Sequence, residues 1–153
     1  MTVGGTVLEK AASRPYAFIN ALANHPSMRP TIGGDGKSKL DLTNFLDNPR
    51  NRSFAWDCGC FLFEWSAPQT FEVHALILPE GRGPEAYRKA AEGIEYIVSE
   101  GCERLWARVP KGDDALKHYT VAAGFAHCGE GSFEIVGVGP REYDLYQWTK
   151  PCR

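Results

Sequence analysis

The chain has 153 residues, of which 43% are hydrophobic and 24% charged, which fits one domain with an ordinary core and disfavours a disordered chain. Lys and Arg number 17 against 19 Asp and Glu, a net charge of −2 that disfavours a protein gripping nucleic-acid phosphates. The longest near-continuous apolar run, Ala75–Pro79, is far shorter than the roughly 20 residues of a membrane helix. The first 15 residues lack the apolar block of a signal peptide. We therefore expect one domain spanning residues 1–153, located in the cytoplasm, with no nucleic-acid or membrane partner.

The chain has five cysteines, and an odd number fits reduced thiols in a cytosolic protein. Cys58-Gly59-Cys60, with His74 or His127, raises the alternative of a structural zinc site. Zinc pairs usually have two or four intervening residues, and the sequence offers no second pair to complete a tetrahedron. We expect ordinary turn and strand cysteines and no metal.

The N-terminal third alternates turn formers with short apolar clusters. The cluster Tyr16–Leu22 predicts a short helix entered at Pro15, a residue suited to a first helical turn. Leu42–Leu46 predicts a second helix with Asp41 as its cap. Residues 25–39, between the two helices, are expected to form a long exposed loop, and such loops are often functional.

From residue 53 onward, aromatic and β-branched runs separated by turn residues predict an antiparallel meander over residues 53–56, 60–65 and 70–78. In the third run, alternation divides the side chains between two faces. One face receives Phe71, Val73, Ala75 and Ile77, and the other receives Glu72, His74, Leu76 and Leu78.

The second half alternates helices and strands. An apolar stripe predicts a helix over Pro84–Ser99, followed by a strand at 104–109 and a helix at 113–123 capped by Asp113. Further strands are expected at 125–128 with 132–136, and at 142–148. The order α-α-β-β-β-α-β-α-β-β predicts an α+β fold with a mixed, mostly antiparallel sheet of about six to seven strands, flanked by about four helices. It has one parallel crossover, and an edge strand such as 142–148 would allow a homodimer.

A candidate anion site lies where the strand ending at Leu78 leads into the helix beginning at Pro84. Arg82 and its flanking glycines precede the helix, whose first amide groups and positive dipole end suit a phosphate. The glycine spacing matches neither a Walker loop nor a dinucleotide fingerprint. The alternative is a glycine turn that only starts a helix.

The element order, the segment Phe71–Gly83 and the run Ala122-Ala123-Gly124-Phe125 after a helix resemble the GNAT superfamily of acyl-CoA-dependent N-acetyltransferases. The resemblance covers residues 54–128 well and the flanks loosely. Asn24-His25-Pro26, with Arg29-Pro30 and Gly33, is similar to small phage and prophage members. The resemblance implies acetyl transfer from acetyl-CoA to a primary amine of a small molecule or protein.

In this family, backbone groups of one strand bind pantetheine, and an R/Q-x-x-G-x-G/A loop wraps the pyrophosphate. The resemblance assigns these roles to Leu76, Ile77, Leu78, Arg82, Gly83, Glu85, Ala86 and Asp113. The loop departs from the family pattern, because Glu85 and Tyr87 stand where glycine or a small residue is usual and Pro84 lacks an amide donor. These departures favour the alternative of a catalytically silent GNAT-fold binding or assembly protein of phage or prophage origin.

For an active enzyme, Glu72 and His74 share one strand face and are the candidates for the base that deprotonates the amine. The alternative is that they bond each other or cap a sheet edge. A backbone amide near Leu76 would polarise the thioester carbonyl. Tyr119 would protonate the leaving thiolate, although its place in an apolar helical stripe favours core packing, and the family's usual tyrosine position is Thr120.

Overall fold

The computed structural model describes residues 16–32, 35–135 and 137–152. Residues 16–23 are helical, and the other helices are α2 (Thr43–Asp47), α3 (Pro84–Ser99) and α4 (Asp114–Ala122), with 3-10 turns at Arg29–Thr31 and Pro79–Gly81. The strands are β1 (Arg52–Trp56), β2 (Gly59–Ala67), β3 (Thr70–Ile77), β4 (Arg104–Pro110), β5 (Ala126–Ile135) and β6 (Gly139–Thr149). Among the described residues, no helix combines the length and apolarity needed to cross a membrane.

The six strands form one sheet in the order β1-β2-β3-β4-β6-β5. Only β3 and β4 are parallel, and α3 provides the crossover between them. The predicted α+β architecture is therefore confirmed. Residues 126–135 form one continuous strand instead of two runs, because β6 pairs with them throughout and a register shift between His127 and Gly129 absorbs the irregularity.

The prediction that residues 142–148 form a sheet edge is wrong. They belong to β6, which pairs with β4 on one side and β5 on the other, so its backbone groups are used on both sides. The strands at the edges are β1 and β5. An edge-to-edge dimer would therefore have to use one of those two strands.

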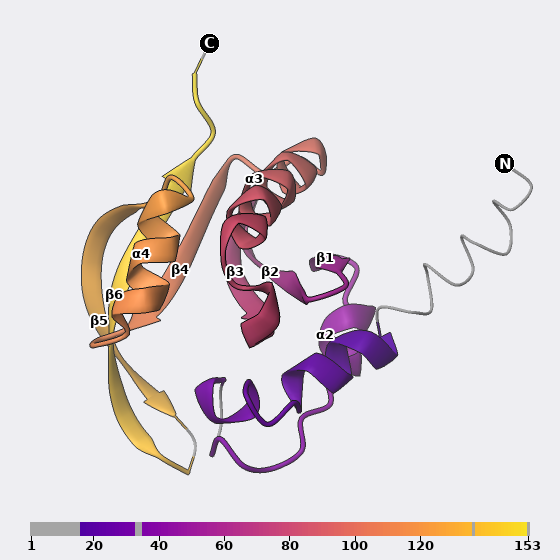
Figure 1. Ribbon diagram of the computed structural model, residues 1–153. Coiled ribbons are helices and arrows are strands. Elements are labelled where there is room, and N and C mark those ends of the chain that lie inside the picture. Colours follow the sequence, from indigo (N-terminus) through magenta and orange to yellow (C-terminus); the bar gives the residue numbers. More distant parts are fainter. Residues whose placement is uncertain (1–15, 33–34, 136, 153) are drawn as a thin grey trace, which may run out of the picture.

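Helices lie on both faces of the sheet (Figure 1), and each face carries its own core. α3 and α4 cover one face, where Phe71, Val73 and Ile77 of β3 contact them as alternation predicts. On the opposite face, helix 16–23 and α2 pack against Leu76 and Leu78. β3 therefore has helices on both of its faces.

The segment after the first helix is more tightly bound than the expected exposed loop. Arg29 is buried, and its guanidinium donates to the carbonyls of Ile32 and Ser38 and pairs with Asp35 at 3.2 Å. The Asn24 side chain exchanges two hydrogen bonds with the Leu40 backbone. Pro15 and Gly33 lie outside the described residues.

The second helix, α2, begins at Thr43, so the N-cap position falls on Leu42 and not on Asp41. Asp41 still accepts a hydrogen bond from the Thr43 amide at 3.0 Å. The carboxylate therefore acts as predicted on the first turn, but from one residue further back in the chain.

The feature that positions the site is the divergence of β3 from β4. Their parallel pairing covers only Thr70–Arg104, Phe71–Leu105 and Glu72–Trp106. Beyond Glu72, β3 continues to pair with β2 and β4 continues to pair with β6. The two strands separate in Figure 1, and the backbone pairing between them stops in the middle of the sheet.

Candidate active site

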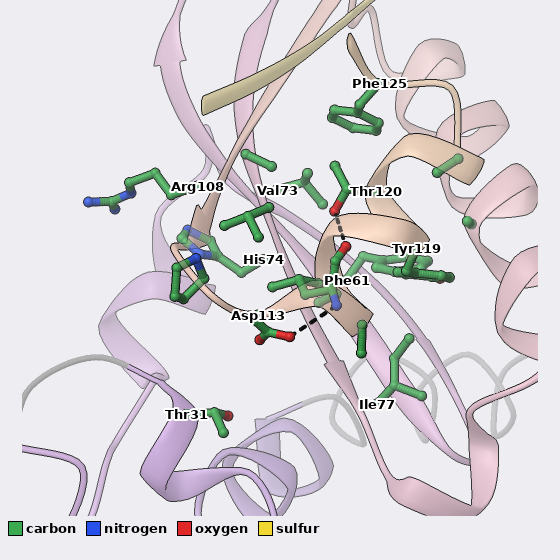
Figure 2. Close-up of a pocket in the computed structure, with 18 of the residues that line it drawn as sticks. Thr31, Phe61, Val73, His74, Ile77, Arg108, Asp113, Tyr119, Thr120 and Phe125 are labelled. Carbon is green, nitrogen blue, oxygen red and sulfur yellow. Dashed lines mark hydrogen bonds between the residues drawn. The ribbon is translucent and has the colours of Figure 1, made fainter. Parts of the chain in front are cut away.

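A cavity of about 910 Å³ lies at this divergence (Figure 2). Its walls come from β3 and β4, the first turns of α3 and α4, the turn end of the β5–β6 hairpin and the segment around Thr31. Its volume is in the range of ordinary small-molecule sites. Most of the predicted site residues line it: Glu72, His74, Ile77, Arg82, Gly83, Ala86, Asp113 and Tyr119. Leu76, Leu78 and Glu85 do not line it.

The direction of the β3 backbone groups follows from the register. The Leu78 amide donates to the Cys58 carbonyl at 2.8 Å, and hydrogen-bonded positions alternate along an antiparallel ladder, so the Leu76 amide also faces β2. The amides of Ala75 and Ile77 therefore face the opposite way, toward the opening that β4 has left. The donors predicted at Leu76 and Leu78 are thus engaged with β2, and Ala75 and Ile77 supply the amides at the cavity.

The predicted anion loop ends in a helix without a side-chain cap. Gly83 occupies the N-cap position with φ of 143°, a conformation that favours glycine, and Pro84 follows as the first helical residue. Arg82 donates from Nε to the Ile77 carbonyl at 3.0 Å, which fixes its guanidinium beside the cavity. Glu85 is exposed and faces away from the lining, while Ala86 is buried within it.

α4 presents its N-terminus to the same cavity. Asp113 is its N-cap as predicted, and its carboxylate accepts a hydrogen bond from the Leu116 amide at 3.1 Å. This capping bond uses one carboxylate oxygen.

Tyr119 packs against the core and also lines the cavity. Its hydroxyl donates to the Ala86 carbonyl at 2.7 Å, and its ring meets Tyr87 edge-on at 5.4 Å. Burial raises the pKa of Tyr119 well above its ordinary value. The hydroxyl is therefore a protonated donor at physiological pH, held between α3 and α4.

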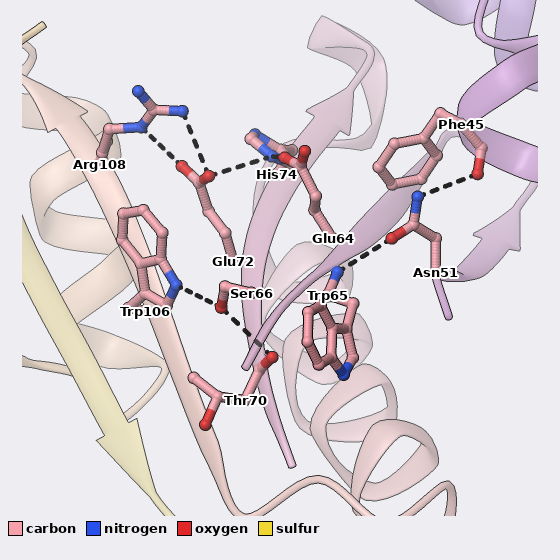
Figure 3. Close-up of polar contacts among 10 residues, drawn as sticks. All are labelled: Phe45, Asn51, Glu64, Trp65, Ser66, Thr70, Glu72, His74, Trp106 and Arg108. Carbon is pink, nitrogen blue, oxygen red and sulfur yellow. Dashed lines mark hydrogen bonds and ion pairs between the residues drawn. The ribbon is translucent and has the colours of Figure 1, made fainter. Parts of the chain in front are cut away.

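Hydrogen bonds and ion pairs link four charged or titratable side chains across β2, β3 and β4 (Figure 3): Glu64, His74, Glu72 and Arg108. Arg108 donates from Nε and Nη2 to the two oxygens of Glu72, at 2.6 and 3.2 Å. The Glu72 side chain is only 6% exposed, so this bidentate pair compensates a buried charge. Glu72 is consequently committed to Arg108, which leaves His74 better placed to accept a proton.

His74 lies between two carboxylates. Its Nε2 is 3.1 Å from Glu64 Oε1 and 3.7 Å from Glu72 Oε1. The hydrogen bond from His74 is the main reason that the pKa of Glu64 lies below its ordinary value, and the charges of His74 and Arg108 lower it further against the opposing effect of burial. A carboxylate can only accept, so Nε2 carries the hydrogen and Nδ1 is the nitrogen available as a base in the neutral ring.

Glu64, Glu72 and His74 are also close enough to share a metal ion, with ligand atoms within 4.8 Å of one another. Arg108 already occupies both oxygens of Glu72 and would repel a cation there. In a second set, His127, Glu130 and Asp144, both carboxylates are paired with Lys111.

The five cysteines are free thiols. Cys60 is buried in the core beside helix 16–23, where burial raises its pKa to about 12. Cys58 lies in the turn between β1 and β2 and is partly exposed.

The sequence reasoning missed Arg108, Glu64, Arg141 and Tyr143. Arg108 carried a usable signal, because it stands between the buried residues Ala107 and Val109 in a strand whose alternation gives it the opposite face. A charged residue at the centre of an interior strand needs a partner, and Glu72 on the neighbouring strand was the candidate. Arg141 and Tyr143 lie at a hairpin end whose position depends on long-range pairing.

The sequence matches no protein-family model and no curated protein sequence. Solved structures do match. Ribosomal-protein-alanine N-acetyltransferase from Brucella melitensis has a TM-score of 0.65 and 18% identity over 91% of this chain and 94% of that chain. The chain has the GNAT fold.

Two further structures with this fold were solved with bound acetyl-CoA or CoA. yncA from Salmonella typhimurium, with its cofactor acetyl-CoA, has a TM-score of 0.71 and 15% identity over 92% of this chain and 91% of that chain. Spermidine N-acetyltransferase from Vibrio cholerae, in complex with CoA and spermine, has a TM-score of 0.69 and 13% identity over 90% of each chain. At these identities the likeness establishes the GNAT fold, and the chemistry has to be argued from this chain's own residues.

Proposed function

We propose that the protein is an acyl-CoA-dependent N-acyltransferase that transfers an acetyl group to a primary amine. The observation that carries the proposal is the opening between β3 and β4. There the amides of Ala75 and Ile77 face a cavity that also receives the N-terminus of α3 on one face of the sheet and His74 on the other. A thioester lying in this opening would be accessible from both faces.

The cofactor would run from the α3 N-terminus to the centre of the sheet. The positive dipole end of α3 and the Arg82 guanidinium suit a pyrophosphate. The Ala75 and Ile77 amides suit the carbonyl groups of a pantetheine arm, which would pair with β3 as a further strand does. The acetyl-CoA and CoA bound in two GNAT-fold neighbours support this choice of cofactor.

The transfer step assigns three roles. The neutral amine attacks the thioester carbonyl carbon, its proton passes to His74 Nδ1 directly or through water, and a backbone amide at Ala75 or Ile77 stabilises the oxyanion. The carbon–sulfur bond then breaks, and its electron pair leaves on the coenzyme sulfur. Tyr119 would supply a proton to that thiolate, for which its hydroxyl must turn away from the Ala86 carbonyl.

The first test is thermal unfolding with millimolar acetyl-CoA, with free coenzyme A and ATP as comparison ligands. A ligand at about 100 times its dissociation constant adds about 2.7 kcal/mol, a shift of several degrees. Ala75→Trp would fill the opening and abolish the shift. Ala55→Trp is the matched control, since Ala55 is an exposed strand residue that does not line the cavity. Equal shifts in both variants would contradict the proposed cofactor position.

The alternative is a catalytically silent GNAT-fold binding protein. Pro84, which lacks an amide, and the acidic Glu85 in the first turn of α3 favour it, since both weaken an anion site. No unfolding shift with acetyl-CoA at any concentration would support this alternative over the enzyme.

A further inference from the structure

We propose that the acceptor is an amine that also carries a carboxylate a few bonds away, and that Arg108 binds this carboxylate. This inference rests on the proposed N-acyltransferase function and specifies its acceptor. It follows from the charges on the sheet face opposite α3 and α4, where His74, Glu72 and Arg108 meet the cavity.

Arg108 has donors left over. A guanidinium offers five N–H groups, and Glu72 accepts from Nε and Nη2. The two hydrogens of Nη1 have no acceptor among the residues that the structure describes. Phe133 lies against the guanidinium at 4.6 Å, so part of the group is screened from water while 28% of the side chain remains exposed. A carboxylate in the cavity would complete its hydrogen bonding.

The spacing of charges matches a zwitterion. Glu72 Oε1 contacts both Arg108 Nη2, at 3.2 Å, and His74 Nε2, at 3.7 Å. The His74 ring and the Arg108 guanidinium therefore flank one carboxylate oxygen, which brings the two side chains within the length of a small molecule of each other. An ammonium group near His74 would be attracted by Glu64 and Glu72, while a carboxylate on the same small molecule would reach Arg108.

Arg141 adds positive charge on the same face. It lines the cavity next to Tyr143 and is exposed. Its side chain makes no ion pair or hydrogen bond with any residue in the described ranges. Its pairing with Phe133 places it beyond the end of β4, at the mouth, where an arginine would attract anionic acceptors and repel polyamines.

The experiment compares acceptors that differ only in the carboxylate. Alanine, leucine and β-alanine are assayed against their amides, with spermidine as a polycation, and acetylated product is measured by mass spectrometry. We expect kcat/KM to favour each acid over its amide by at least about tenfold, because a charged hydrogen-bonded pair is lost with the amide.

Variants localise the effect. Arg141→Gln should raise KM for the acids by about three- to tenfold with little change for the amides, because a rim charge is lost. Arg104→Gln, an exposed β4 arginine outside the cavity lining, should change neither. Arg108→Lys, checked for folding by thermal unfolding, should remove most of the preference for acids.

The outcomes separate the two proposals. If amides or spermidine are acetylated as well as the acids, or if acetyl-CoA binds but no acid is acetylated, the carboxylate inference is wrong while the cofactor assignment stands. If acetyl-CoA produces neither an unfolding shift nor product with any amine, the N-acyltransferase proposal itself fails. A preference for acids that survives both Arg141→Gln and Arg108→Lys would also overturn the role given to Arg108.

Discussion

Glu72, the last β3 residue that pairs with β4, meets Arg108 two residues beyond its pairing partner Trp106, with Glu72 Oε2 2.6 Å from Arg108 Nε. Side chains therefore connect the two strands at the point where backbone hydrogen bonding stops. The pair fixes the width of the opening at its narrow end, and it orients the carboxylate that lies beside His74.

This arrangement predicts a large cost for removing the arginine. Arg108→Met leaves the Glu72 charge buried without its partner, and we expect a loss of about 3 kcal/mol in the free energy of unfolding. Urea unfolding would measure it, with Arg104→Met as the exposed control. The double variant Glu72→Gln/Arg108→Met should recover much of the loss, since no uncompensated charge then remains. A loss equal to that of the control would contradict the structural role of the pair.

The Glu64–His74 contact predicts a pH dependence of stability. The folded-state pKa of Glu64 is lowered, so its contribution is fully present above the ordinary glutamate pKa and disappears as the pH falls through the lowered value. Glu64→Gln should thus destabilise the protein at pH 7, by less than about 1 kcal/mol for so exposed a pair, and make no difference at the acid end. Thermal unfolding of both proteins from pH 7 to pH 3 tests this. A difference that grows toward low pH would have the wrong sign.

His74 rather than Glu72 is predicted to be the base. His74→Gln should lower kcat by about 100-fold, the lower end of what general-base catalysis contributes, and should flatten the acid limb of the kcat/KM pH profile. The exposed His25 lies outside the cavity lining, so His25→Gln is the matched control. A normal pH profile in His74→Gln would exclude His74, and Glu72→Gln would then be the variant to examine.

Any side chain at Gly93, where α3 crosses the sheet, is predicted to lower the free energy of unfolding. A Cβ at this position would come within 2.6 Å of the Phe61 ring, which itself contacts the rings of Trp56 and Phe63. Gly93→Ala gains about 1 kcal/mol of helix propensity, but overpacking costs about 1–3 kcal/mol, so we expect net destabilisation. Urea unfolding compared with Glu95→Ala, exposed on the same helix, tests it. Stabilisation would mean that Phe61 has room to move.

Much of the fold was predictable because local rules and tertiary structure agree. The alternation in β3 assigned Phe71 and Leu76 to opposite cores, and Asp113 was identified as the cap of α4. The strand order was less predictable, because placing β6 inside the sheet depends on pairing between residues far apart in the chain.

Most residues of the candidate site were predictable from the sequence, whereas the backbone atoms that face the cavity were predictable only in part. The strand-to-helix junction and the pair Glu72 and His74 were found from residue types. Whether the Leu76 amide or the Ala75 amide faces the cavity depends on which of the two bonds to β2. The alternation of side chains does not determine this, because it leaves open which backbone positions bond to which neighbouring strand. Arg108 was missed because its partner lies 36 residues away, across the parallel crossover.

The short contact between β3 and β4 has a mechanical consequence. Long antiparallel ladders hold β1–β3 together and β4–β6 together, whereas only three ladder pairs of the backbone join one half of the described sheet to the other. We therefore expect the angle between the two halves of the sheet to change more easily than either half bends, with a hinge near Phe71. An extended molecule that hydrogen-bonds to both β3 and β4 would extend the contact between the two halves and reduce their relative motion. Occupancy should then be detectable as slower amide hydrogen exchange along both strands, well away from the atoms that touch the ligand.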